Sequence, residues 1–184
     1  MTLSRVVRQT LVGVIGLPLL ARLYVRKADV PKLPELAKIL FRTKFRQAAE
    51  MLTAMASGLP KSDHRPRVVV DGAYANREFL KPAFMAGFDV VARLRKDAAL
   101  TDRPPVLAPG TKRGRGRPPI YGKDVVSLAK RAGQKRGWAE LKSTTASGRE
   151  VTECFKTFLA TWRPAGGVIR VVILKARTTR GGPS

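Results

Sequence analysis

A run of three valines that ends in an acid and a glycine constrains the fold of this chain most. Val68, Val69 and Val70 are β-branched and have no polar residue between them, which is typical of a strand buried on both faces. Asp71 then stands at the carboxyl end of the strand, and Gly72 lets the backbone turn. Ligands and reacting groups collect at this end of the strands in open α/β sheets. Asp71 is therefore a candidate metal ligand, and an Asp that only caps the next helix is an equally good interpretation.

The residues after Asp71 predict a helix and a second strand. Asn76 can cap a helix that ends at Gly87, and Pro82 inside it is expected to disturb its regularity. The apolar face of this helix would be Phe79, Leu80, Ala83 and Phe84. The next strand is expected over 88–94. A strand, a helix and a strand in this order imply two parallel strands joined by a right-handed crossover.

Two segments upstream of the valines are also patterned. Apolar residues recur at steps of three and four over 41–58, which predicts an amphipathic helix that ends at Gly58. The apolar run over 11–20 follows two arginines, as in a signal peptide, but it contains glycines and a proline and lacks a small-residue cleavage site. It is also shorter than the ~20 residues that span a membrane. We therefore expect a buried strand or strand pair that continues to Val25, with a targeting segment as the alternative.

The excess of positive charge predicts a polyanionic partner. The chain has 36 Lys and Arg against 13 Asp and Glu, a net charge of +23 over 184 residues. Such a field attracts nucleic acid, and the affinity falls with salt as counterions are released. Anionic membrane is the weaker alternative, because the basic residues are spread along the chain. The single cysteine, Cys154, excludes an internal disulfide and fits a cytoplasmic protein, and the lone His64 is expected at the surface.

Six basic residues are candidate contacts to nucleic-acid phosphates. Three follow the second predicted strand, near the expected level of Asp71, and three lie in a segment rich in Pro, Gly and cations over 101–124. They are Arg93, Arg95, Lys96, Arg113, Arg115 and Arg117. Residues 115–118, Arg-Gly-Arg-Pro, resemble an AT-hook core that reads the A·T minor groove. A linker that binds phosphates without sequence preference is the favoured interpretation, and a solvated basic edge is the alternative for the first three.

The last third of the chain predicts a small antiparallel sheet. A short helix is expected over 125–132 and strands over 138–145, 151–162 and 168–175, with turns at 146–148 and 164–167 and a frayed end from 177. Four aromatic residues accompany these strands: Trp138, Phe155, Phe158 and Trp162. They are expected to pack under the sheet, and stacking on bases is the less favoured interpretation.

Several separated motifs, in order, resemble bacterial insertion-sequence transposases of the DDE class. The strongest is residues 68–76, Val-Val-Val-Asp-Gly-Ala-Tyr-Ala-Asn, and the others lie at 17–25, 41–44, 80–82, 90–100, 114–118 and 156–167. The resemblance implies an α/β fold: a partial ribonuclease-H-like core, with a mixed sheet and flanking helices, followed by a small β-rich insertion. The expected segments are the core at 1–100, the basic linker at 101–124 and the insertion at 125–184.

The resemblance also implies a chemistry and a partner. Members of the class use two aspartates and a glutamate to hold two divalent ions, Mg²⁺ or Mn²⁺, which cleave and transfer DNA strands. Asp71 matches the second aspartate. The first would precede residue 11, where 1–10 contain no acid, and the glutamate would follow the insertion, where no acid follows Glu153. We therefore expect an internal fragment of a transposase that binds DNA at the bacterial nucleoid without processing it. The alternatives are a non-catalytic nucleic-acid-binding or regulatory protein and a poorly folded relic.

Overall fold

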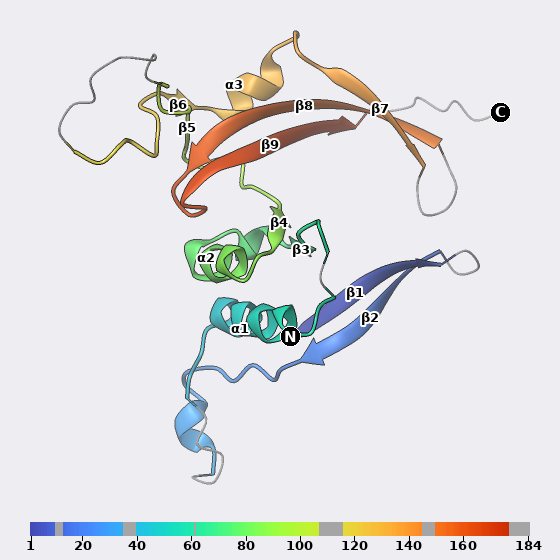
Figure 1. Ribbon diagram of the computed structural model, residues 1–184, viewed down its shortest axis with the longest axis vertical. Coiled ribbons are helices and arrows are strands. Elements are labelled where there is room, and N and C mark those ends of the chain that lie inside the picture. The colour runs from blue at the N-terminus through green and yellow to red at the C-terminus, as the bar shows by residue number, and fades with distance from the viewer. Residues whose placement is uncertain (10–12, 35–39, 61, 107–115, 145–149, 177–184) are drawn as a thin grey trace. The chain divides into compact units, whose positions relative to one another are not determined.

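The chain forms two compact units, Met1–Leu94 and Arg95–Ser184 (Figure 1). The structure is a computed structural model that describes residues 1–9, 13–34, 40–60, 62–106, 116–144 and 150–176. The predicted turn at 146–148 and the predicted frayed end from 177 lie outside these residues. The separate linker predicted over 101–124 stays a prediction.

The first unit begins with an antiparallel hairpin of β1 (Thr2–Gln9) and β2 (Gly13–Ala21). The strand pair predicted around 11–20 is present, but its predicted burial is wrong. Val14, Leu17 and Leu20 keep 51%, 46% and 39% of their surface exposed. Branched apolar residues favour an extended backbone, whereas burial requires a layer packed on the strand, and a two-stranded ribbon has two faces to cover. β2 also ends at Ala21 and does not continue to Val25.

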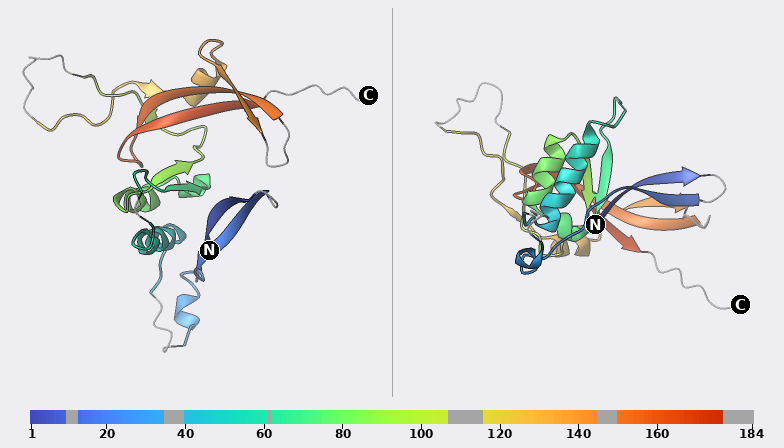
Figure 2. Two further views of the ribbon diagram at one scale, coloured as in Figure 1. Left: turned by 45° about the vertical axis from the view of Figure 1, so that its right-hand side comes forward. Right: turned by 90° about the horizontal axis from the view of Figure 1, so that it is seen from below.

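Two helices, α1 (Lys44–Ala56) and α2 (Arg77–Met85), pack against each other in the first unit (Figure 2). Each begins at a polar cap, because Thr43 accepts from the Arg46 N–H and Asn76 accepts from the Phe79 N–H, both at 3.1 Å. The buried residues of the helices are Ala49, Met51, Leu52, Phe79, Leu80 and Ala83. Both predicted helices are confirmed. Phe84 is 37% exposed and not buried as predicted, because periodicity gives the direction of a helix face but not where the contact ends.

Two short strands, β3 (Arg67–Val70) and β4 (Asp89–Ala92), are parallel and paired. β3 precedes α2 in the sequence and β4 follows it. They pair from Arg67 with Asp89 to Val70 with Ala92, which confirms the predicted strand, helix, strand order. The predicted burial of the valines on both faces is wrong. Val68 is buried, but 75% of the surface of Val69 is exposed, so that only one face of β3 is covered.

The second unit is an antiparallel sheet built around the long strand β8 (Glu150–Trp162). β8 pairs with β9 (Gly167–Ala176), with β7 (Ala139–Thr144) over residues 150–155 and with β5 (Leu100–Thr101) at residues 161–162. The three predicted strands and the turn between β8 and β9 are confirmed, and Gly166 in that turn has a φ of +78°.

The helix predicted over 125–132 is shorter than expected. Val125 and Val126 form β6 (Val125–Val126), which pairs with β5, and α3 (Leu128–Gly133) begins only after its cap, Ser127. The prediction is wrong for the two valines, because β-branched residues next to an open strand edge gain ladder hydrogen bonds there.

A buried threonine closes the sheet where β5 meets β8. The Thr161 hydroxyl group is fully buried, lies 2.7 Å from the Thr101 hydroxyl and donates to the Asp102 carbonyl at 2.7 Å. Gly122 donates its N–H to the same Asp102 carbonyl at 3.1 Å, and a Cβ on Gly122 would lie only 1.8 Å from Asp102 Oδ1. Residues 102 and 122 near the two ends of the predicted linker are therefore hydrogen-bonded to each other.

The elements confirm the predicted α/β class. The first unit has the strands and helices of a partial ribonuclease-H-like core, and the second is the predicted β-rich part. Among the described helices, none is long and apolar enough to cross a membrane.

Candidate functional site

Asp71 lies at the carboxyl end of β3, where the sequence places a metal ligand. It is exposed, and its Oδ1 accepts a hydrogen bond from the Gly72 N–H at 2.5 Å. It thereby caps a single 3₁₀ turn, Gly72–Tyr74, while α2 has its own cap, Asn76. The strand-end position and the capping role are both present. A cap that uses one carboxylate oxygen leaves the group able to take a cation on the other.

The other residues of the Asp-Gly-Ala-Tyr motif fix the position of this turn. A Cβ on Gly72 would lie 2.8 Å from the Arg93 carbonyl oxygen, so that the turn can approach the end of β4 only with glycine there. The ring of Tyr74 meets Phe45 of α1 and Phe79 of α2 edge to face, with centroids 5.4 and 5.5 Å apart. The backbone that carries Asp71 is thus held by the neighbouring strand and by both helices.

The six predicted phosphate contacts lie in different parts of the chain. Arg93 is exposed and follows β4. Its carbonyl oxygen lies next to Gly72, so the residue is beside the turn that carries Asp71. Arg95 and Lys96 are exposed at the start of the second unit, where Arg95 Nε lies 3.2 Å from Asp97 Oδ1. Arg117 is exposed as well. Arg113 and Arg115 lie outside the described residues, so that the AT-hook interpretation stays a prediction.

A complete metal site is not formed by the part of the chain that the structure describes. Within it there is no group of three or more His, Cys, Asp or Glu side chains that could hold a metal ion. Asp29 lies beside Lys32 at 3.2 Å, and His64 is exposed as predicted. Asp71 alone fits only a part of the three-carboxylate set that two divalent ions require.

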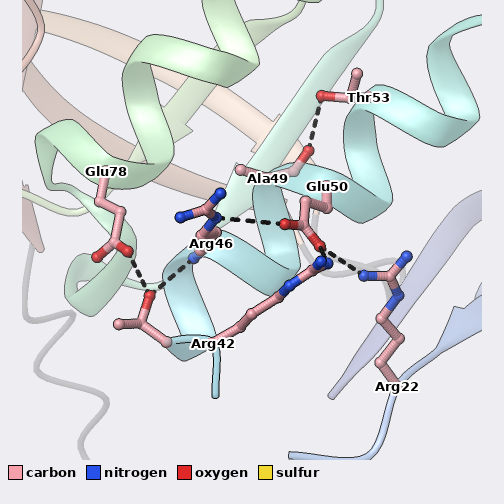
Figure 3. A network of polar contacts seen from close by, with 8 residues as sticks. Arg22, Arg42, Arg46, Ala49, Glu50, Thr53 and Glu78 are labelled. Atoms are coloured by element: carbon pink, nitrogen blue, oxygen red, sulfur yellow. Dashed lines mark hydrogen bonds and ion pairs between the residues drawn. The ribbon is translucent and has the colours of Figure 1, made fainter. Parts of the chain in front are cut away.

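Around Glu50 lies a polar cluster that the sequence did not reveal (Figure 3). Glu50 Oε2 accepts from Arg22 at 2.8 Å and from Arg42, and Arg46 Nε lies 3.4 Å from Oε1. Burial by itself would raise the pKa of Glu50, but hydrogen bonds from Arg22 and Arg42 and the charges of both guanidinium groups lower it. Only the spacing of four between Arg46 and Glu50 is a local signal.

The four aromatic side chains predicted to pack under the sheet, Trp138, Phe155, Phe158 and Trp162, are half-buried. Two of them are covered by cations of the chain itself: Lys156 Nζ lies 4.9 Å from the Trp138 ring centroid, and Arg131 Cζ lies 5.2 Å from that of Phe158. This agrees with packing under the sheet more than with stacking on bases.

Comparison with known families identifies the chain. The family described as DDE superfamily endonuclease matches residues 13–163, from the start of β2 to the turn after β8, and this range includes Asp71 and parts of both units. A search of curated proteins and a search of solved structures each gave no significant match. The matched range has the motifs that resemble DDE transposases, and it covers more than half of the 184 residues. The chain therefore belongs to the DDE superfamily endonucleases.

Proposed function

We propose that this chain binds DNA through its basic residues, that Asp71 supplies one metal-binding carboxylate, and that the chain does not cleave DNA by itself. The observation behind this proposal is a net charge of +23 together with a single carboxylate, Asp71, at the carboxyl end of β3. The family acts on nucleic acid and generally uses divalent metal ions. The partners we propose are transposon ends and target DNA, in the cytoplasm at the bacterial nucleoid.

The position of Asp71 suits a hard cation. Its carboxylate is exposed, and the Gly72 N–H orients one of its oxygens. Carboxylate oxygens are the ligands that Mg²⁺ and Mn²⁺ prefer, and such ions stabilise charge on the oxygens of a phosphodiester during strand cleavage. Because one carboxylate is a third of the set used by the class, the role proposed for Asp71 is metal binding, without strand cleavage by this chain alone.

The basic residues would contact phosphates without reading sequence. Arg93, beside Asp71, would lie where a DNA strand approaches a metal ion. The remaining contacts would come from Arg95, Lys96, Arg113, Arg115 and Arg117. Arginine contacts of this kind set position and affinity, and each neutralised phosphate makes the affinity more dependent on salt.

Incubation of the purified chain with supercoiled plasmid and Mg²⁺ or Mn²⁺ tests this proposal. We expect the plasmid to be retarded in a gel, less so as salt rises, and not to be nicked. The matched variant is Asp71→Asn, whose amide oxygen can still accept from the Gly72 N–H while the charge is lost. We expect titration of the wild type with Mn²⁺ to show a metal-binding site, and we expect Asp71→Asn to lack this site. Nicking by the wild type that disappears in Asp71→Asn would contradict the non-cleaving assignment, and no retardation at low salt would contradict DNA binding.

A further inference from the structure

Helix α3 and the loop after it concentrate positive charge in the second unit. Residues 127–138 contain Lys130, Arg131, Lys135 and Arg136 and no acid, which gives +4 in twelve residues, compared with +23 in 184 for the chain. All four are exposed. Among the residues that the structure describes, none of the four forms an ion pair with a carboxylate. The local charge density is therefore more than twice the average, and it is not neutralised within this part of the protein.

A buried lysine holds this segment on the sheet. Lys156 of β8 is only 6% exposed, and its Nζ donates to the carbonyls of Arg131 and Gln134, both at 3.0 Å. The same Nζ lies over the Trp138 ring, and the Trp138 Nε1–H donates to the Gln134 carbonyl at 2.9 Å. Two donors thus converge on the carbonyl of Gln134, immediately after the end of α3.

A second contact fixes the other side of the segment. The Arg131 guanidinium covers the ring of Phe158 on β8, and the Ser127 hydroxyl caps α3 by accepting from the Lys130 N–H at 3.3 Å. Arg131 is therefore used in packing, while Lys130, Lys135 and Arg136 have no such contact in the described residues. A basic segment held at both ends loses less conformational freedom on binding an anion than a free loop does.

The choice of lysine at position 156 is informative. Burying an ammonium group is costly, so that an apolar residue at this position would serve a purely stabilising role at least as well. What only a donor at this position provides is the pair of hydrogen bonds to the backbone of α3 and its loop. The arrangement favours a defined backbone beneath the exposed cations.

We propose that Lys130, Lys135 and Arg136 form a binding surface for the phosphate backbone of duplex DNA, and that Lys156 is its positioning residue. This inference rests on the proposed function, since it presumes that the chain binds DNA. Compact cations held on a turn contact phosphates independently of base sequence. The surface is distinct from the six basic residues that the sequence indicates.

A pair of triple variants tests the surface. In one, Lys130, Lys135 and Arg136 are changed to Gln; in the matched control, the exposed residues Lys142, Arg170 and Lys175 of β7 and β9 are changed to Gln, so that the charge change is the same. We expect the slope of log K against log salt, measured by fluorescence anisotropy with a short duplex, to fall by up to about 2.7 for the first triple, at ~0.9 per phosphate. The control should keep nearly the wild-type slope.

Equal effects of the two triples would overturn the proposed surface, because they would show that only net charge matters. If the wild type itself does not bind the duplex, the proposed function fails and this inference fails with it. If the wild type binds the duplex and the two triple variants have equal effects on the salt slope, the proposed function stands and only the proposed surface is wrong.

The role of Lys156 needs variants of its own. Lys156→Met and the control Lys142→Met each remove one positive charge, but Lys156 is buried and cannot itself reach DNA. We expect Lys156→Met to weaken binding roughly two- to tenfold more than the control, the cost of ordering a loop side chain on binding. Trp138→Phe keeps an aromatic ring and the net charge but removes the donor to Gln134, and should weaken binding in the same direction even if Lys156→Met does not fold. A folded Lys156→Met that binds no more weakly than Lys142→Met would overturn the positioning role, and if Lys156→Met does not fold, wild-type affinity in Trp138→Phe would contradict the need for a fixed Gln134 carbonyl.

Discussion

Gly72 shows how a single residue sets the place of the candidate metal ligand. Gly72 follows Asp71 in the chain. A Cβ added to it would lie closest to the Arg93 carbonyl oxygen, which belongs to the backbone and cannot rotate away. The turn that carries Asp71 therefore touches the end of β4 directly. Any Cβ at this position must separate the two backbones or distort the turn.

We expect Gly72→Ala to lower the free energy of unfolding by about 1–3 kcal/mol, the usual cost of overpacking a rigid contact. The measurement is unfolding in urea, followed by circular dichroism. Gly58→Ala in the same unit is the control, because its Cβ would meet only the Met55 carbonyl oxygen, at 3.7 Å. Equal stability of the two variants would show that the turn does not need to approach β4.

Glu50 gives a prediction about pH. Its pKa in the folded chain lies below the ordinary value of 4.5, so that the carboxylate contributes stability above about that pH, and the contribution is lost as the pH falls through the folded pKa. We expect Glu50→Gln to be less stable than the wild type by about 1 kcal/mol at pH 7, since the ion pairs are partly exposed.

The difference between Glu50→Gln and the wild type should stay constant from pH 7 down to about the ordinary value of 4.5, and should shrink as the pH falls further, through the lowered pKa of the folded chain. Denaturant unfolding at a series of pH values measures it. Asp63→Asn, which removes a charge from an exposed loop, is the control and should show little change at any pH. A difference for Glu50→Gln that persists unchanged at the lowest pH would contradict the ion-pair origin.

At the scale of elements, the sequence was a good guide to where strands and helices lie and a poor guide to what covers them. Both strands around α2 were predictable, because the valines, the cap Asn76 and Gly87 are local signals. The exposure of Val69 and Leu17 was not, since burial depends on which layers pack on a strand. The position of Asp71 was predictable for the same local reason. The Glu50 cluster was not, because Arg22 is 28 residues away from Glu50 in the chain.

A substitution of Thr161 tests how the junction of β5 and β8 is stabilised. Thr161→Val keeps the shape of the side chain but removes the donor to the Asp102 carbonyl and the contact with the Thr101 hydroxyl. We expect a loss of about 1–3 kcal/mol in the free energy of unfolding, the cost of leaving a buried polar group unpaired. The control is Thr157→Val, an exposed position on the same strand, expected to change stability by less than about 0.5 kcal/mol. Similar values for both variants would mean that the buried hydroxyl is not needed for the junction.

At the scale of the whole molecule, the dominant property is charge. We expect a chain of +23 to bind many polyanions, so that affinity alone would say little about specificity. Dependence on salt and on base composition is more informative, because phosphate contacts respond to the first and groove contacts to the second. These two measurements separate the two interpretations of the Arg-Gly-Arg-Pro segment.

We expect Arg115→Gln together with Arg117→Gln to weaken binding to A·T-rich and G·C-rich duplexes by the same factor. The salt slope should fall by about 0.9 for each phosphate that the variant no longer neutralises, because arginines on the DNA backbone release counterions. Anisotropy titrations with the two duplexes at several salt concentrations measure this. Weaker binding to the A·T-rich duplex alone would contradict phosphate contact and favour reading of the minor groove.

Lys156 and Thr161 lie five residues apart on β8, and alternate residues of a strand face opposite sides, so the two polar side chains project from opposite faces of the sheet. Each satisfies backbone carbonyls that belong to a different part of the second unit. A slip of β8 by one residue would turn both to the wrong side, so that an ammonium group and a hydroxyl group would lose their acceptors and each of three carbonyls would lose one donor. The two residues therefore act together as a check on strand register, so that a misaligned sheet is costly on both faces and the unit is protected against folding into a shifted alternative.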